Sequence, residues 1–108
     1  MIRFLAHTMQ LTGVKLKYLN EIMTHELKTW PVYYQDIIDG NKSFEVRKDD
    51  RGFNVGDVLR LREYGWKKPL DPVIERYTGR YCYVRVDYIY RGIGIQDGYC
   101  IMSITQIN

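Results

Sequence analysis

The feature that most constrains the fold is the period-two alternation of the run YCYVRVDYIY, residues 81 to 90. Side chains on a strand point alternately to its two faces, and here one parity is entirely apolar. Its members are Cys82, Val84, Val86, Tyr88 and Tyr90. Because charged residues fall on the opposite parity, the run predicts a strand with one face on the core.

Three other segments also carry strand patterns. HELKTW, residues 25 to 30, can form a short extended strand. In DVLRLREY, residues 57 to 64, leucines alternate with arginines, as expected for a strand with one wet face. YCIMSITQI, residues 99 to 107, is apolar on both faces and is therefore predicted to lie inside the sheet. Glycines and prolines across residues 65 to 80 predict a long surface loop.

One helix is predicted to begin at Pro31, whose missing N–H costs nothing in the first turn, with Thr29 or Trp30 as the cap. Gly40 can adopt the left-handed conformation that ends a helix. The apolar stripe between them consists of Tyr33, Tyr34, Ile37 and Ile38. Strand, helix and then four strands predict an α+β fold, a small mixed β-barrel of about five strands with the helix packed beside it.

The chain has the length of one domain with a single core. Strong patterning starts at His25, so residues 25 to 108 are expected to form the domain and residues 1 to 24 an appendage. Helical spacing of apolar residues across residues 13 to 23 suggests a short helix there, although translation could also start at Met23.

Composition argues against several classes of function. No stretch approaches the ~18 to 20 apolar residues that span a bilayer, and the first residues lack a full signal-peptide pattern. A cytoplasmic protein without a membrane partner is therefore expected. Cys82 and Cys100 form no C-x-x-C motif, and His7 and His25 are isolated, so a solvated or capping histidine is expected at each. We expect neither a metal site nor a cofactor.

The candidate site centres on the stretch GNKSFEVRK, residues 40 to 48. Glu45 and Arg47 share one face of a predicted strand, roughly 6 to 7 Å apart between α-carbons. Lys42 and Lys28 can bring ammonium groups to the same rim. One acceptor among several donors suits a base edge with a phosphate, and the net charge of +3 allows a polyanionic partner. From residue types alone, however, a surface ion pair without function is favoured.

The alternation in this stretch also assigns the remaining side chains of the strand. Phe44 and Val46 fall on the parity opposite to Glu45 and Arg47. They are apolar, so we expect them to face the core while the charged residues project toward a cleft.

The pattern G-x-K-x-x-E-x-R, formed by Gly40, Lys42, Glu45 and Arg47, resembles the signature of the ASCH domains of the PUA-like superfamily. The run HELKTWPVYYQDIIDGNKSFEVRKDDRGFNVGDVLRLREY, with the later YTGR and DGYCIMSI, is similar to an uncharacterised phage and bacterial branch of ASCH-like proteins. The resemblance implies a PUA-like β-barrel that binds RNA or a modified nucleotide in a cleft between helix and barrel. The binding residues that we expect are Lys28, Lys42, Glu45, Arg47, Lys48 and Arg51.

The resemblance also implies an alternative function. A subset of ASCH proteins hydrolyses N4-acetylcytidine with a lysine, a threonine and a glutamate. Lys42 matches that lysine, but Glu45 stands where the subset has threonine, and Ser43 would have to supply the hydroxyl. Binding is therefore better supported than an amidohydrolase with Lys42, Glu45 and Ser43 as its catalytic set. A third alternative is a phage accessory protein that binds a host protein through its tyrosine-rich strands.

Overall fold

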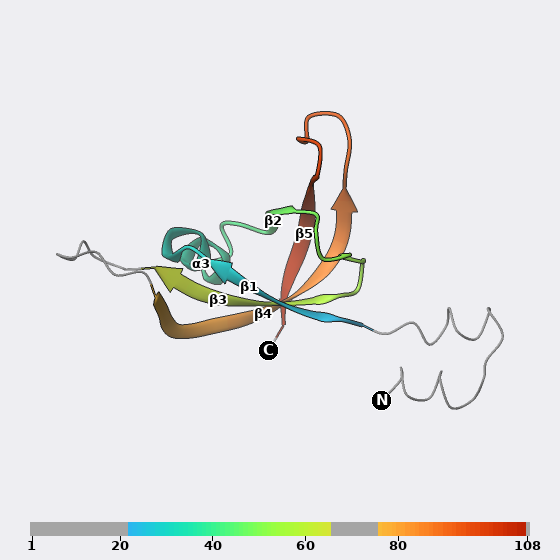
Figure 1. Ribbon diagram of the computed structural model, residues 1–108. Coiled ribbons are helices and arrows are strands. Elements are labelled where there is room, and N and C mark those ends of the chain that lie inside the picture. Colours follow the sequence, from blue (N-terminus) through green and yellow to red (C-terminus); the bar gives the residue numbers. More distant parts are fainter. Residues whose placement is uncertain (1–21, 66–75, 108) are drawn as a thin grey trace, which may run out of the picture.

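The computed structural model describes residues 22 to 65 and 76 to 107. Within them, five strands form one curled mixed sheet in the order β1-β3-β4-β5-β2, and one short helix packs beside it (Figure 1). The predicted α+β fold of about five strands and a helix is confirmed as a half-barrel. The helix expected across residues 13 to 23 falls almost wholly outside the described residues. The bounds are β1 Thr24–Thr29, α3 Pro31–Ile38, β2 Phe44–Lys48, β3 Val58–Gly65, β4 Arg76–Tyr90 and β5 Tyr99–Ile107.

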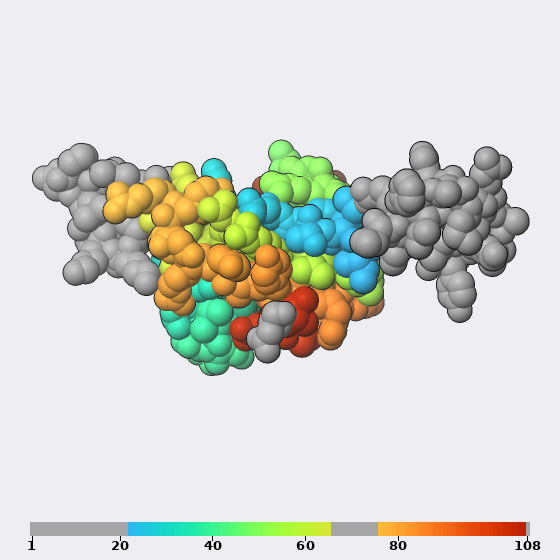
Figure 2. Space-filling view, turned by 90° about the horizontal axis from the view of Figure 1, so that it is seen from below, coloured from blue at the N-terminus to red at the C-terminus, as the bar shows by residue number. Residues whose placement is uncertain are grey.

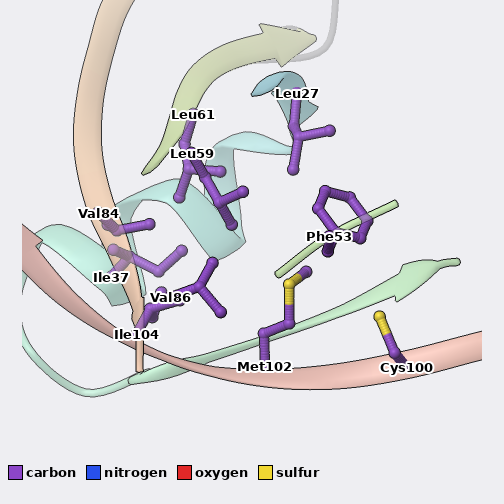
Figure 3. Close-up of a cluster of buried hydrophobic side chains, with 10 residues drawn as sticks. All are labelled: Leu27, Ile37, Phe53, Leu59, Leu61, Val84, Val86, Cys100, Met102 and Ile104. Carbon is purple, nitrogen blue, oxygen red and sulfur yellow. The ribbon is translucent and has the colours of Figure 1, made fainter. Parts of the chain in front are cut away.

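The sheet combines one parallel pairing with three antiparallel ones. β1 runs parallel to β3, while β3 with β4, β4 with β5, and β5 with β2 are antiparallel. β5 therefore has a neighbour on each side, as its two apolar faces predicted. The core lies inside the curl, where ten side chains from the sheet, α3 and the loop before β3 meet (Figure 3). They are Leu27, Ile37, Phe53, Leu59, Leu61, Val84, Val86, Cys100, Met102 and Ile104.

Two arginines link the edge strands β1 and β2, each of which has a strand neighbour on one side only among the described residues. Arg47 on β2 donates from Nη2 to the carbonyl oxygen of Lys28 at 2.9 Å. Arg51, just after β2, donates from Nη1 to the carbonyl oxygen of Glu26 at 2.8 Å. These side chains hold the edges of the half-barrel together where a strand ladder would close a full barrel.

The outer face of β1, β3 and β4 carries charges that pair with one another and with aromatic rings. Figure 2 shows this face, where β1 (blue) and β4 (orange) flank β3 (yellow-green). Glu26 accepts hydrogen bonds from Arg60 at 2.5 Å and Arg62 at 3.2 Å, and these bonds lower the pKa of Glu26. The two guanidinium groups lie over the rings of Tyr81 and Tyr77, 4.3 and 3.6 Å from their centres.

Helix α3 begins and ends where the sequence predicted. Pro31 is its first residue and Trp30 its N-cap, and no side chain caps the helix. The hydroxyl of Thr29, the other predicted cap, accepts a hydrogen bond from Arg47. Gly40 has a φ of +79°, and its N–H donates to the carbonyl oxygen of Ile37 at 3.0 Å. The predicted apolar stripe of α3 lies only partly in the core, because Tyr34 and Ile37 are buried whereas Tyr33 is half exposed.

The expected core face of β2 is wrong. Phe44 and Val46 are 41% and 50% exposed, whereas Glu45 is only 2% exposed. The strand turns its charged parity inward because Glu45 has a cation on each carboxylate oxygen and so avoids the penalty of an unpaired buried charge.

The expectation for β4 is also wrong at both ends. The strand already begins at Arg76, so part of the predicted loop across residues 65 to 80 is strand. Near its other end the register with β5 shifts between Val86 and Tyr88. This β-bulge reverses the parity, so Tyr88 is 62% exposed while Ile89 packs on the core.

The prediction of a solvated or capping histidine at position 25 is wrong, because His25 is buried in the sheet and does not cap α3. It is 9% exposed, and its Nε2 lies 2.8 Å from Oδ2 of Asp57, which is itself buried. Asp57 also accepts the N–H groups of Asn54 at 2.9 Å and Met23 at 3.2 Å. This cluster fastens the start of β1 to the turn that precedes β3.

Candidate functional site

A cavity of about 440 Å³ lies where the end of β1, the start of α3 and the strand β2 meet. We call it the cleft. It contains four of the six predicted binding residues, from segments that are apart in the sequence. The lining residues are Lys28, Thr29, Trp30, Tyr33, Lys42, Phe44, Glu45, Val46 and Arg47.

Glu45 organises the charges of the cleft. Its Oε2 accepts a hydrogen bond from Nζ of Lys42 at 2.9 Å, and its Oε1 accepts one from Nε of Arg47 at 2.7 Å. Hydrogen bonds between charged groups are the strong ones, and burial of the carboxylate shields them from water. Two cations against one carboxylate leave this group of three with a net positive charge at the wall of the cleft.

The two cations are held by further contacts. Nη2 of Arg47 also reaches Oγ1 of Thr29 at 3.2 Å, in addition to the Lys28 carbonyl. Nζ of Lys42 donates to the carbonyl oxygen of Phe44 at 2.8 Å and lies 5.3 Å from the centre of the Tyr33 ring. Both side chains still reach solvent, with 16% of Lys42 and 23% of Arg47 exposed. They are therefore positioned in advance and remain accessible to a ligand.

The other predicted residues lie elsewhere. Lys48 is exposed at the end of β2 on the parity opposite to Glu45, and it does not line the cleft. Arg51 bonds the Glu26 carbonyl, where it bridges the sheet edges. Ser43 is exposed and is not part of the lining, whereas Thr29 lines the cleft with a buried aliphatic hydroxyl.

The sequence analysis did not predict five of the lining residues, which are Thr29, Trp30, Tyr33, Phe44 and Val46. Thr29 shares the inward parity of His25 and Leu27 in β1, and this alternation is a signal that could have placed its hydroxyl inside. Tyr33 was assigned to the apolar stripe of the helix, yet its ring is 49% exposed at the cleft. A stripe of apolar residues on a short helix does not reveal which ring lies beyond the edge of the core.

Metal sites and membrane-spanning helices are not found in the described part of the chain. Across residues 22 to 65 and 76 to 107, no group of three or more His, Cys, Asp or Glu side chains could hold a metal ion. Burial raises the pKa of the Cys82 and Cys100 thiols. Within the same residues, no helix has the length and apolar character needed to cross a bilayer.

The comparison with known proteins gives a family but no established activity. None of the curated proteins matches the chain. A family model matches residues 24–104, from the first residue of β1 into β5, and so includes every residue that lines the cleft. The chain therefore belongs to the family described as a domain of unknown function, DUF3850.

Proposed function

We propose that this protein is an ASCH-type, PUA-like domain that binds RNA or a nucleotide, with the cleft as its binding site. The observation that carries the proposal is the pair of cations, Lys42 and Arg47, held in place by the buried carboxylate of Glu45 in a cavity of about 440 Å³. This volume lies within the ~300 to 1,000 Å³ that small-ligand pockets occupy. The same three residues form the K-x-x-E-x-R part of the ASCH-like signature.

The roles of the residues follow from their contacts. Lys42 and Arg47 supply donors for phosphate oxygens or for acceptors on a base edge. Glu45 holds both cations, since each of its oxygens already accepts a hydrogen bond from one of them. The rings of Trp30 and Tyr33, 46% and 49% exposed, supply surfaces on which a base can stack.

Replacing Lys42 with glutamine tests this proposal. We expect the affinity of the full chain for single-stranded RNA to fall about tenfold, and the slope of log K against log salt to become shallower by roughly 0.7 for each phosphate that the protein no longer neutralises. Titrations at several salt concentrations would measure both quantities, and circular dichroism would verify the fold of each variant.

Lys48→Gln is the matched control, because it removes the same charge from β2 outside the cleft. We expect a smaller loss of affinity in this variant. Equal losses of affinity in the two variants would indicate that RNA contacts the outer side of β2 and not specifically the cleft. Unchanged affinity and slope in Lys42→Gln would contradict the assignment of the site.

The amidohydrolase alternative has one observation in its favour, because the cleft brings the Thr29 hydroxyl together with Lys42 and Glu45. In the observed geometry each oxygen of Glu45 accepts a hydrogen bond from a cation, and the Thr29 hydroxyl accepts one from Arg47. The carboxylate is therefore not placed to take a proton from this hydroxyl, so we expect no acetate release from N4-acetylcytidine. Incubation with the full chain and detection of cytidine and acetate would test this. If the wild-type chain hydrolyses N4-acetylcytidine and Glu45→Gln does not, the amidohydrolase function would be favoured over the binding function.

A further inference from the structure

A second cavity adjoins the cleft. It has a volume of about 600 Å³ and lies between the first turn of α3 and the strands β3 and β4. Its lining residues are Trp30, Pro31, Val32, Tyr33, Gln35, Glu63 and Arg80. Trp30 and Tyr33 line both cavities, so these two aromatic side chains stand at the boundary between them.

The second cavity repeats the chemistry of the cleft. Glu63 on β3 is 1% exposed and accepts a hydrogen bond from Oγ1 of Thr78 at 2.6 Å. Nε of Arg80 lies 3.7 Å from the same carboxylate oxygen. Each cavity is therefore lined by a buried glutamate with an arginine close to its carboxylate, Glu45 with Arg47 in the cleft and Glu63 with Arg80 in the second cavity.

Arg80 is fixed in a position from which it can still bind a ligand. Its Nη2 donates to Oε1 of Gln35 at 3.0 Å, and its guanidinium carbon lies 4.8 Å from the centre of the Tyr34 ring. The side chain nevertheless remains 38% exposed. A guanidinium group has five N–H donors in a planar fork, so the contacts with Gln35 and Glu63 leave donors that can meet a phosphate or a base edge.

We infer that the cleft and the second cavity form one two-part site, whose ligand is a single strand of at least two consecutive nucleotides. This inference rests on the proposed function and specifies its ligand. One nucleotide would lie in the cleft against Lys42 and Arg47, and the next would lie in the second cavity against Arg80. The rings of Trp30 and Tyr33 would stack with the bases where the strand passes between the cavities. The bases of a duplex are already stacked and paired, so they could not reach these rings.

The experiment compares ligands of one and two nucleotides on the full chain. Isothermal titration would use the 5′-monophosphates of adenosine, cytidine, guanosine and uridine, and the matching homodinucleotides with a 5′-phosphate. We expect at least one dinucleotide to bind about tenfold more tightly than its monophosphate, which is within the range for stacking one base on an aromatic ring. Arg80→Gln should reduce this gain, because the second nucleotide loses its contact with the guanidinium group, and it should leave the affinity for the monophosphate unchanged. Lys42→Gln should weaken the binding of both ligands.

Arg85→Gln is the control, because Arg85 is also on β4 but lines neither cavity. It should leave both affinities unchanged. Monophosphate affinity that survives in Arg80→Gln also reports that the cleft is intact. If that variant does not fold, Arg80→Lys, which keeps the charge without the planar fork, should lose part of the dinucleotide gain.

The two proposals fail in different ways. If the wild-type chain binds both ligands with equal affinity, or if Arg80→Gln weakens both by the same factor, the two-part site is wrong and the proposed function stands. If the wild-type chain binds neither ligand, or if Lys42→Gln changes neither affinity, the proposed function is overturned and this inference with it.

Discussion

Replacing Arg47 with methionine is expected to lower the free energy of unfolding by roughly 3 kcal/mol, the lower end of the range for breaking a buried ion pair. Glu45 would lose one of its two cations while its carboxylate stays buried. The carbonyl oxygen of Lys28 and the hydroxyl of Thr29 would lose a donor, and with it one link between β2 and β1. Methionine keeps most of the aliphatic volume, so the change mainly removes the charge. Urea unfolding would measure it.

Arg85→Met is the matched control for Arg47→Met. Nε of Arg85 lies 2.8 Å from Oδ1 of Asp87, so the partner is again two residues away on a strand, but both side chains are exposed. Exposed ion pairs contribute about 0 to 1 kcal/mol. The double variant Glu45→Met with Arg47→Met should be more stable than Arg47→Met alone, because no buried carboxylate is left with only one cation. Equal losses of unfolding free energy in Arg47→Met and Arg85→Met would show that the Glu45–Arg47 pair stabilises the protein no more than an exposed ion pair does.

The alternation in β2 shows where period-two patterns stop being informative. It separated Phe44 and Val46 correctly from Glu45, but hydrophobicity alone assigned the apolar pair to the core. In the structure Phe44 and Val46 are exposed and Glu45 is buried at the wall of the cleft. There Lys42 and Arg47 pair with its carboxylate. An inward carboxylate is stable only with partners, and the arginine that pairs with it is itself held by Thr29 on another strand. These contacts could be found only with the strands in place.

The β-bulge in β4 was beyond sequence reasoning for a different reason. Nothing in YCYVRVDYIY marks Asp87 as an extra residue, since the apolar parity runs without interruption to Tyr90. The shift depends on the pairing with β5, where Val86 pairs with Ile104 and Tyr88 with Ser103. Asp87 faces outward and accepts hydrogen bonds from Thr105 at 2.5 Å and Arg85 at 2.8 Å, which lower its pKa. Register belongs to two strands and is not encoded in either one alone.

The resemblance to ASCH domains implied the cleft, whereas residue types alone favoured a surface ion pair without function. The residues of the cleft fall within 28 to 33 and 42 to 47, two segments that α3 brings together over a short stretch of chain. The second cavity was missed because Glu63 and Arg80 join Trp30 only through the β1–β3 and β3–β4 pairings. Gly65 also lies against Trp30, and a Cβ there would be only 3.0 Å from the indole ring. Such an approach cannot be inferred from a glycine in a predicted loop.

Asp57→Ala is expected to lower the free energy of unfolding by about 3 kcal/mol, because each buried polar group left without a partner costs about 1 to 3 kcal/mol. Asp57 is 2% exposed and accepts the N–H groups of Asn54 and Met23, and it also pairs with His25. The substitution would detach the start of β1 from the turn before β3. Urea unfolding of the full chain would measure the loss.

Asp50→Ala is the control for Asp57→Ala. Asp50 lies in the same connection between β2 and β3, but its side chain is 55% exposed and lies 3.9 Å from Arg51. It should stay within about 0.5 kcal/mol of the wild type. The double variant His25→Ala with Asp57→Ala should cost less than the sum of the single variants, because each single change already breaks their shared bond. Neither His25 nor Asp57 lines the cleft, so folded Asp57→Ala should keep its affinity for RNA. Additive losses would mean that the two residues stabilise β1 independently, and a loss no larger than that of Asp50→Ala would contradict the role of Asp57 altogether.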